Sequence, residues 1–257
     1  DPTMGPGGQP PEFDIHTLVA DIGYALTDRL QLSLSLPFST GSISRLGWGA
    51  GNPDRHQQRA TGFGDLSLLG SLWLLNPKSH QNGNVSFGLG VKAPTGSHTK
   101  SSWHYSASDS VAFPAHQTVQ PGDGGWGFTF QGQAFQRVSE GIYAYGFGSY
   151  TANPKDQTEV TLAPTGPNSL LHWSVPDFYQ ARLGAAFSVW PEQGLSVSLG
   201  GRLDGIPTAD LFGGGDTTAV KTPSQIVYAD PGLSLSRGKS SFTLSVPIRL
   251  HAKRSQS

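Results

Sequence analysis

The sequence predicts an all-β protein, an antiparallel transmembrane β-barrel with about ten strands visible in this chain. Three observations predict this class. Apolar and small polar residues alternate over many segments, short and long breaks separate these segments in turn, and charged residues are few. Charged residues make up 14% of the chain, against roughly 25% in an average soluble protein. The hydrophobic content of only 36% also fits, because only alternate residues of a barrel strand need be apolar.

The clearest strand covers 30–38, where leucine or phenylalanine alternates with glutamine, serine and proline. Two further segments, 177–190 and 195–204, alternate in the same way on either side of the tight turn 191–194. Each is about ten residues long, the length that a tilted strand needs to cross the hydrocarbon of a bilayer. In chain order the predicted strands cover 18–26, 30–38, 64–75, 85–93, 126–135, 142–150, 177–190, 195–204, 225–236 and 242–250.

Each of the other segments has one apolar or aromatic face and one face of small or polar residues. This pattern is what identifies each of them as a strand. The apolar or aromatic faces carry, in chain order, Leu18, Ile22 and Tyr24; Leu66, Leu68, Leu72 and Leu74; Val85, Phe87, Leu89 and Val91; Trp126, Phe128 and Phe130; Tyr143, Tyr145 and Phe147; Val227, Leu233 and Leu235; and Phe242, Leu244, Val246, Ile248 and Leu250.

The breaks between the strands are short and long in turn. The short break 76–84 contains a proline and an Asn-Gly pair, which are turn formers. The long breaks are 39–63, 94–124, 151–176 and 205–224. Loops of roughly twenty residues are unusual in a compact soluble domain, but they are typical of one side of an outer-membrane barrel. We therefore expect 1–257 to form one barrel domain with an N-terminal loop, 1–14, and a polar tail, 251–257.

A soluble β-sandwich or a lipocalin-like barrel would also show alternation. In a soluble protein the polar face meets water and is rich in Lys and Glu, whereas here it is mainly Ser, Gly, Gln and Thr. The few charges on this face are of both signs and can pair across a narrow lumen. The residues predicted to line the lumen are Asp21, Asp65, Lys92, Gln131, Gln133, Arg182, Arg202, Asp204, Asp230 and Arg249.

The strand count has a consequence for the ends of the barrel. With an even number of strands, both ends of the chain lie on the same side of the barrel. The first and last predicted hairpins each have a short turn, so this is the side of the long loops. Outer-membrane barrels normally keep both ends with the short turns. We therefore expect one further strand before 18 and one after 250, giving about twelve strands in the intact protein.

Aromatic residues near the strand ends are predicted to lie at the two membrane interfaces, where such residues form girdles. The general preference of aromatic residues for strands accounts for about half of such placements. The predicted interface aromatics are Phe38, Trp126, Phe178, Tyr179, Trp190 and Phe242.

No catalytic, metal or cofactor site is predicted, and an enzyme is not expected. The chain has Cys 0, so it has no disulfide or thiolate, and its 8 histidines match no metal-ligand spacing. No GxSxG motif occurs, and a net charge of -1 offers no basic surface to nucleic acid. No apolar run of about 18 residues predicts a transmembrane helix. The polar residues 1–3 do not begin a signal peptide, so we expect that any signal was removed or lies outside this sequence.

Five segments, in order along nearly the whole chain, resemble outer-membrane barrels of the transporter family associated with the MetA pathway of phenol degradation. They are GYALTDRLQLSLSLPF (23–38), GFGDLSLLGSLWLL (62–75), GLGVKAPTG (88–96), QPGDGGWGF (120–128) and DPGLSLSRGKSSFTLSVPIRL (230–250). The resemblance implies a barrel in an outer membrane of the Gram-negative type, with a further strand beyond 257. It supplies no substrate-binding residues.

These observations predict a channel or transporter for a small, hydrophobic or aromatic solute in the bacterial outer membrane. Its partners would be outer-membrane lipid, the solute and, at the long loops, other proteins, but not nucleic acid. The alternative is a structural or anchoring barrel, whose lumen is plugged by paired charges and whose long loops dock partner proteins. Ion conductance separates the two hypotheses, because only an open lumen passes ions.

Overall fold

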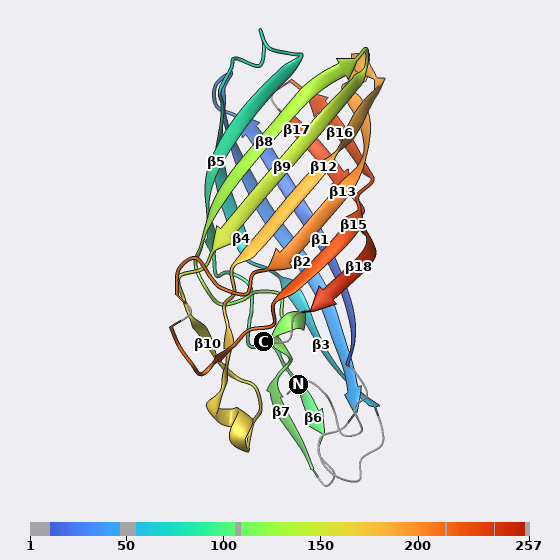
Figure 1. Cartoon of the computed structure of the whole chain (residues 1–257). Helices are drawn as coiled ribbons and strands as arrows, with labels where there is room; N and C mark the ends of the chain where they lie inside the picture. The colour runs from blue at the N-terminus through green and yellow to red at the C-terminus, as the bar shows by residue number, and fades with distance from the viewer. Residues whose placement is uncertain (1–10, 47–54, 106–108, 214, 239, 255–257) are drawn as a thin grey trace.

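The computed structural model describes residues 11–46, 55–105, 109–213, 215–238 and 240–254, and it shows a barrel of tilted strands joined to a cluster of loops (Figure 1). Ten strand positions close the barrel. They are β1 (Glu12–Ala25), β2 (Leu30–Leu46), β4 (Leu66–Trp73), β5 (Gly83–Ala93), β8 (Gly127–Ser139), β9 (Ile142–Ala152), β12 (Phe178–Trp190), β13 (Leu195–Ile206), β15 (Ser224–Ala229) with β16 (Gly232–Arg237), and β17 (Ser240–Ser245) with β18 (Ile248–Arg254). The predicted all-β antiparallel barrel is therefore confirmed.

Neighbouring strands of the barrel follow the chain order and pair antiparallel, from β1 round to β13 and on to the last hairpin. The ring closes where β17 pairs with β1. β1 begins and β18 ends at the long-loop side of the barrel, as the even strand number predicts (Figure 1). The expectation of about twelve strands in the intact protein stays a prediction.

The last hairpin differs from its prediction. The strands expected at 225–236 and 242–250 are each broken in two, at Pro231 and at Pro247. A proline has no N–H to give to a sheet ladder, so pairing stops there. β16 pairs with β17 on one side of the break, and β15 pairs with β18 on the other. β18 also continues to Arg254, so the predicted polar tail is wrong for 251–254, and 255–257 lie outside the described residues.

Two predicted loops are partly strands. β1 begins at Glu12, inside the loop predicted at 1–14, and residues 1–10 lie outside the described part of the chain. In the loop predicted at 39–63, β2 continues to Leu46 and β3 (Arg55–Phe63) pairs back onto it, whereas 47–54 are not described. The outward residues of these extensions are polar and their buried apolar residues, Ile43 and Ala60, lie on the inner face, so the outward apolar pattern of the barrel strands does not continue there.

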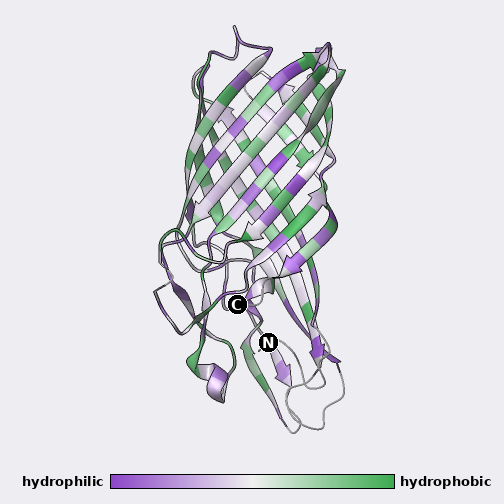
Figure 2. Ribbon diagram, in the orientation of Figure 1, coloured by the Kyte–Doolittle hydropathy of each residue, from purple (hydrophilic) through white to green (hydrophobic). Residues whose placement is uncertain are grey.

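Hydrophobic and hydrophilic residues are interspersed along the tilted strands of the barrel (Figure 2), and many of the large apolar side chains are exposed. On β1, β2 and β3 the last apolar outward residues pair with one another: Leu18, Phe38 and Phe63. The next outward residues toward the loops also pair at one level: His16, Thr40 and Thr61. The strands thus continue without a break while their outer surface changes from apolar to polar within one residue pair.

The remaining long breaks hold small elements of their own. They are the hairpin of β6 (Ser101–Tyr105) and β7 (Ser110–Pro114), the sheet of β10 (Gln157–Thr161), β11 (His172–Ser174) and β14 (Ala219–Val220), and the 3-10 turns η1 (Gln117–Val119), η2 (Pro167–Leu170) and η3 (Pro191–Gln193). The predicted loops at 94–124, 151–176 and 205–224 are therefore only partly irregular. No helix in the described ranges is long and apolar enough to cross a membrane.

Candidate functional site in the barrel interior

Two ion pairs lie on the inner face of β12 and β13. Arg182 on β12 donates from Nε to Oδ2 of Asp230 at 2.6 Å and from Nη2 to Oγ of Ser245 at 2.9 Å. Ser245 in turn donates to the second carboxylate oxygen of Asp230. Asp230 is only 1% exposed, and its backbone N–H donates to the carbonyl of Gly200 at 2.8 Å. The break in the last hairpin before Pro231 thus holds a carboxylate inside the wall, where the guanidinium of Arg182 compensates its charge.

The second pair joins Arg202 and Asp204, two residues apart on β13. Arg202 donates from Nε to Oδ1 at 2.8 Å and from Nη2 to Oδ2 at 2.7 Å, a bidentate contact. Gln180 on β12 adds a third donor to Asp204 at 3.0 Å, and the guanidinium lies 5.6 Å from the ring centre of Tyr228. We call Arg182, Arg202, Asp204 and Asp230 the lumen charge cluster. All four were singled out from the sequence as lumen residues.

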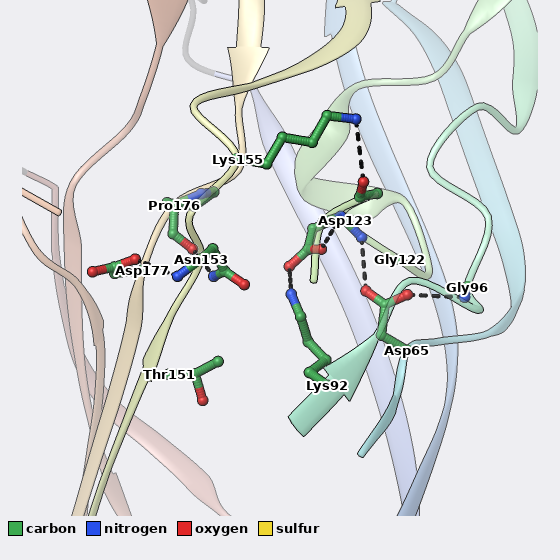
Figure 3. Close-up of polar contacts among 12 residues, drawn as sticks. Asp65, Lys92, Gly96, Gly122, Asp123, Thr151, Asn153, Lys155, Pro176 and Asp177 are labelled. Carbon is green, nitrogen blue, oxygen red and sulfur yellow. Dashed lines mark hydrogen bonds and ion pairs between the residues drawn. The ribbon is translucent and has the colours of Figure 1, made fainter. Parts of the chain in front are cut away.

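A third polar group lies at the loop end of the barrel, where Asp65, Lys92 and Asp123 meet (Figure 3). Lys92 forms an ion pair with Asp123. Asp65 accepts from the backbone N–H of Gly96 at 2.9 Å and from that of Asp123 at 3.0 Å. Burial, and then the neighbouring charge of Asp123, raise the pKa of Asp65. Asp123 was not predicted from the sequence, because it lies within a long loop that folds back onto the barrel.

Glycines let these loops approach one another closely. A Cβ added to Gly122 would lie 2.6 Å from the backbone of Gly96, and one added to Gly96 would lie 2.7 Å from the backbone of Gly64. These distances leave no room for a side chain at either position. The three glycines therefore let the loop between β7 and β8 lie directly against the residues that follow β3 and β5.

The segment 115–123, which we call the mouth cap, packs inside the loop end of the barrel. Its residues Ala115 and Val119 are 0% and 1% exposed and share a small core with Ile43 and Ala60. The ring of His116 lies 5.7 Å from that of Phe13 on β1 and 4.3 Å from that of Trp173 on β11. The cap therefore contacts the wall on one side and the sheet of β10, β11 and β14 on the other.

Asp177 ties two further loops together at this end (Figure 3). Its carboxylate is 0% exposed and accepts from Tyr150 Oη at 2.7 Å, from the N–H of Asn153 at 2.7 Å and from the N–H of Leu211 at 2.6 Å. Its own N–H donates to Asp210 at 3.0 Å, and Asp210 pairs with Lys221 at 2.9 Å. One buried carboxylate thus fixes the start of β12 to the loop 205–224.

Aromatic side chains occupy the inner face toward the short turns. The ring centres of Trp73 and Phe135 are 5.7 Å apart, and those of Phe135 and Tyr143 are 6.2 Å apart. Phe147 pairs with Arg182 in the register of β9 and β12, so its side chain shares the face of the lumen charge cluster. We call Trp73, Phe135, Tyr143, Tyr145 and Phe147 the aromatic patch.

Tyr145 lies across the inner wall, over two glycines of the neighbouring strands. A Cβ added to Gly184 on β12 or to Gly200 on β13 would lie 2.6 Å from Tyr145 Oη in each case. The bare backbone at these positions is what lets the phenol ring lie flat on the wall. The sequence pattern put Tyr143, Tyr145 and Phe147 on one face, and the structure places that face inside the barrel.

Comparison with models of known protein families and with curated proteins finds no match. In the part of the chain that the structure describes, no group of three or more His, Cys, Asp or Glu side chains is placed to hold a metal ion.

The structure also places the remaining predicted residues. Gln131 and Gln133 are half-buried on β8, on the face opposite Phe128 and Phe130. Asp21 on β1 and Arg249 on β18 are exposed and do not join the lumen charge cluster, although Arg249 pairs with Tyr228 in the register of β15 and β18.

The predicted interface aromatics lie at several levels. Phe38 stacks edge-on against Phe63 at 5.2 Å, a partner that was not predicted. Tyr179 accepts from Gln225 Nε2 at 3.2 Å at the loop end of β12, beside Phe178. Trp126 lies directly before β8, Trp190 ends β12 at the short turn, and Phe242 lies within β17.

A half-buried histidine links the β6–β7 hairpin to β2 outside the apolar band. His104 Nδ1 lies 3.4 Å from Arg45 Nη2, and His104 Nε2 lies 3.2 Å from the carbonyl of Pro114. Burial, and then the positive charge of Arg45, lower the pKa of His104 from 6.5 to about 4. The imidazole is therefore neutral in the docked hairpin at neutral pH.

We expect acidification to loosen this hairpin. Between pH 6.5 and about 4 the undocked hairpin binds a proton and the docked one does not, so docking weakens as the pH falls through this window. The loss is at most about 1.4 kcal/mol per pH unit. Amide hydrogen exchange across β6 and β7, corrected for intrinsic rates, measures it. His104→Asn is the control, and an unchanged pH dependence in that variant contradicts the role of His104.

Proposed function

We propose that this chain is an outer-membrane β-barrel that passes a small hydrophobic or aromatic solute through its lumen. The membrane assignment is supported by the level at which the outer surface changes from apolar to polar across β1, β2 and β3 while the strands continue. A soluble barrel has no reason to stop its apolar outer surface at one level, whereas the edge of a hydrocarbon layer imposes such a level.

The aromatic patch is the observation that supports an aromatic solute. Aromatic rings pair favourably edge-on or offset, by about 0.5–1.5 kcal/mol for each pair beyond the area they bury. The patch lies on the inner face of β4, β8 and β9, and Phe147 adjoins Arg182 of the lumen charge cluster. An aromatic solute with a polar or anionic group therefore meets both a ring surface and hydrogen-bond donors along one wall.

The structural or anchoring barrel is kept as a second candidate because of the mouth cap. The cap packs inside the loop end, where an axial route leaves the lumen, and its residues Ala115 and Val119 are fully buried. In that candidate the loops around the cap would bind partner proteins, and the paired charges of the wall would have only a structural role.

Planar-bilayer conductance and solute flux into vesicles separate the two candidates. The refolded protein, checked by heat-modifiable migration on a gel, is expected to give single-channel steps and faster flux of phenol or benzoate than of a sugar. Tyr145→Ala or Phe147→Ala is expected to reduce this preference about two- to tenfold. Phe130→Ala, on the outer face of β8, is the matched control and leaves the preference unchanged. A folded barrel without conductance or flux favours the structural candidate.

A further inference from the structure

One row of side chains on the inner wall places two arginines between two aromatic rings. Arg182 on β12 lies directly opposite Arg202 on β13, and we call these two residues the arginine pair. Phe147 on β9 lies opposite Arg182, and Tyr228 on β15 lies opposite Arg202. Opposite residues of an antiparallel pair share one face of the sheet and lie about 5 Å apart. The four side chains therefore form a continuous strip across four strands.

Both arginines have a counter-charge, and in each case the counter-charge is the less exposed partner. The side chains of Arg182 and Asp230 are 25% and 1% exposed, and those of Arg202 and Asp204 are 22% and 10% exposed. Like charges directly opposite each other are unfavourable, so the two carboxylates are what allows the arginine pair to form. Because these carboxylates are more deeply buried than the guanidinium groups, a solute in the lumen meets hydrogen-bond donors here more readily than acceptors.

The arginine pair also retains donors that the protein does not use. Within the described residues both arginines donate to side chains only from Nε and Nη2, which leaves Nη1 of each without an acceptor. The hydroxyl group of Tyr145 lies beside them. A Cβ added to Gly184 or Gly200, each two residues from one of the arginines, would lie 2.6 Å from its oxygen. In the described ranges this hydroxyl group has no hydrogen-bond partner either, so donors from three side chains are available at one position of the wall.

Other acidic residues of the inner wall lie away from the arginine pair. Asp21 is on β1, which pairs with neither β12 nor β13. Asp65 and Asp123 lie with Lys92 at the loop end of the barrel (Figure 3). Among the residues that the structure describes, the arginine pair thus forms ion pairs only with its own two counter-charges. An anionic solute at the free donors therefore does not face a third carboxylate.

We propose that the arginine pair binds the carboxylate of an aromatic acid, whose ring packs on Phe147 and Tyr145. Guanidinium and phenol groups donate charge-assisted hydrogen bonds to a carboxylate, and an aromatic ring pairs favourably with the rings beside them. A neutral phenol would satisfy the ring surface but would bring no negative charge to the arginine pair. The inference rests on the proposed function and identifies the solute of the channel as an aromatic anion.

Benzoate and benzamide test this inference, because they have nearly the same shape and differ in charge. We would titrate each into the folded barrel in zwitterionic detergent micelles and obtain the dissociation constant from saturation-transfer NMR of the ring protons. The wild-type barrel is expected to bind benzoate about five- to tenfold more tightly than benzamide, because hydrogen bonds to a charged group are stronger but water in the lumen weakens them.

The test variant combines Arg202→Gln with Asp204→Asn, which removes a guanidinium group while the net charge stays the same. Arg182 is kept because the buried Asp230 depends on it. The double variant is expected to lose most of the preference for benzoate and to bind benzamide as before. If it does not fold, Arg202→Gln alone replaces it, since Asp204 then keeps the hydrogen bond from Gln180. Arg237→Gln, at the exposed turn of the last hairpin, is the matched control and leaves the preference unchanged.

Equal binding of benzoate and benzamide by the wild-type barrel overturns the inference. An unchanged preference in the folded variant, or an equal loss for both ligands, also overturns it, because the guanidinium group then does not act on the charge. This readout needs no transport activity. A barrel that conducts but shows no preference for benzoate would retain the proposed function and lose the anion site, whereas a preference that the double variant abolishes, in a barrel without conductance or flux, would do the reverse.

Discussion

Asp230→Ala is expected to lower the free energy of unfolding by about 3–5 kcal/mol, the usual loss when one partner of a buried ion pair is removed. Asp230 is 1% exposed, and its carboxylate is the partner of both Arg182 and Ser245. The variant leaves the Arg182 guanidinium in the wall without a compensating charge. The side chain of Arg182 is 25% exposed, so water offsets part of the loss. We therefore expect a loss near the lower end of this range.

Reversible unfolding in urea from lipid vesicles, followed by tryptophan fluorescence, measures this loss. Asp28→Ala is the matched control, because Asp28 pairs with Lys78 at 2.6 Å while 46% and 75% of the two side chains are exposed. That exposed pair is expected to contribute at most about 1 kcal/mol. Replacing Arg182 and Asp230 together by leucine is expected to cost less than the sum of the single changes. Equal losses for Asp230→Ala and Asp28→Ala would contradict the buried role of Asp230.

Asp177→Ala is expected to release the loop 205–224 while leaving the barrel folded. The carboxylate of Asp177 accepts three hydrogen bonds, from Tyr150, Asn153 and Leu211, and each bond to a charged group contributes about 1.5–3 kcal/mol. Removing it leaves two buried backbone N–H groups unpaired. Limited proteolysis and amide hydrogen exchange of the loop measure the effect, and we expect cleavage within the loop to become much faster.

Tyr150→Phe is the graded control, because it removes one of the three donors and should shift the exchange of the loop by about 1.5–3 kcal/mol. The amide hydrogen exchange of β4 and β5, which are distant from Asp177 in the sequence, provides an internal reference. If their protection falls as far as that of the loop, Asp177 stabilises the whole barrel and not the loop alone.

The barrel strands could be predicted from the sequence because one face of each meets an apolar surrounding, so burial is encoded locally as alternation. The same reasoning fails at the extensions of β1, β2 and β3. There the outward residues, such as His16, Thr40 and Thr61, are polar. The buried apolar residues Ile43 and Ala60 lie on the inner face instead, so the outward apolar pattern of the barrel strands does not continue. The breaks at Pro231 and Pro247 had a signal, since proline is excluded from central ladder positions.

The site was predictable in its residue types but not in its pairing. Arg182, Arg202, Asp204 and Asp230 all fall on the small and polar face, which the sequence shows directly. Arg182 and Asp230 are far apart in the chain, however, and only the closing of β13 against the last hairpin brings them together. Asp123 acts within a long loop, where no periodicity indicates the direction of a side chain. Asp177 begins the predicted strand 177–190, but it lies just before β12 and accepts from Leu211 in a different loop, a contact that alternation does not indicate.

The mouth cap also sets an order of events in folding. Its residue His116 contacts Phe13 near one end of the chain and Trp173 well beyond the middle, so the cap cannot form until distant strands have come together. Contacts of such wide sequence separation form late, because the entropy of closing long loops must first be overcome. Trp173 is 8% exposed in the finished structure. The fluorescence of this tryptophan should therefore report the last step of maturation, after the wall has assembled, and a chain stalled before that step would expose its mouth to proteases and chaperones.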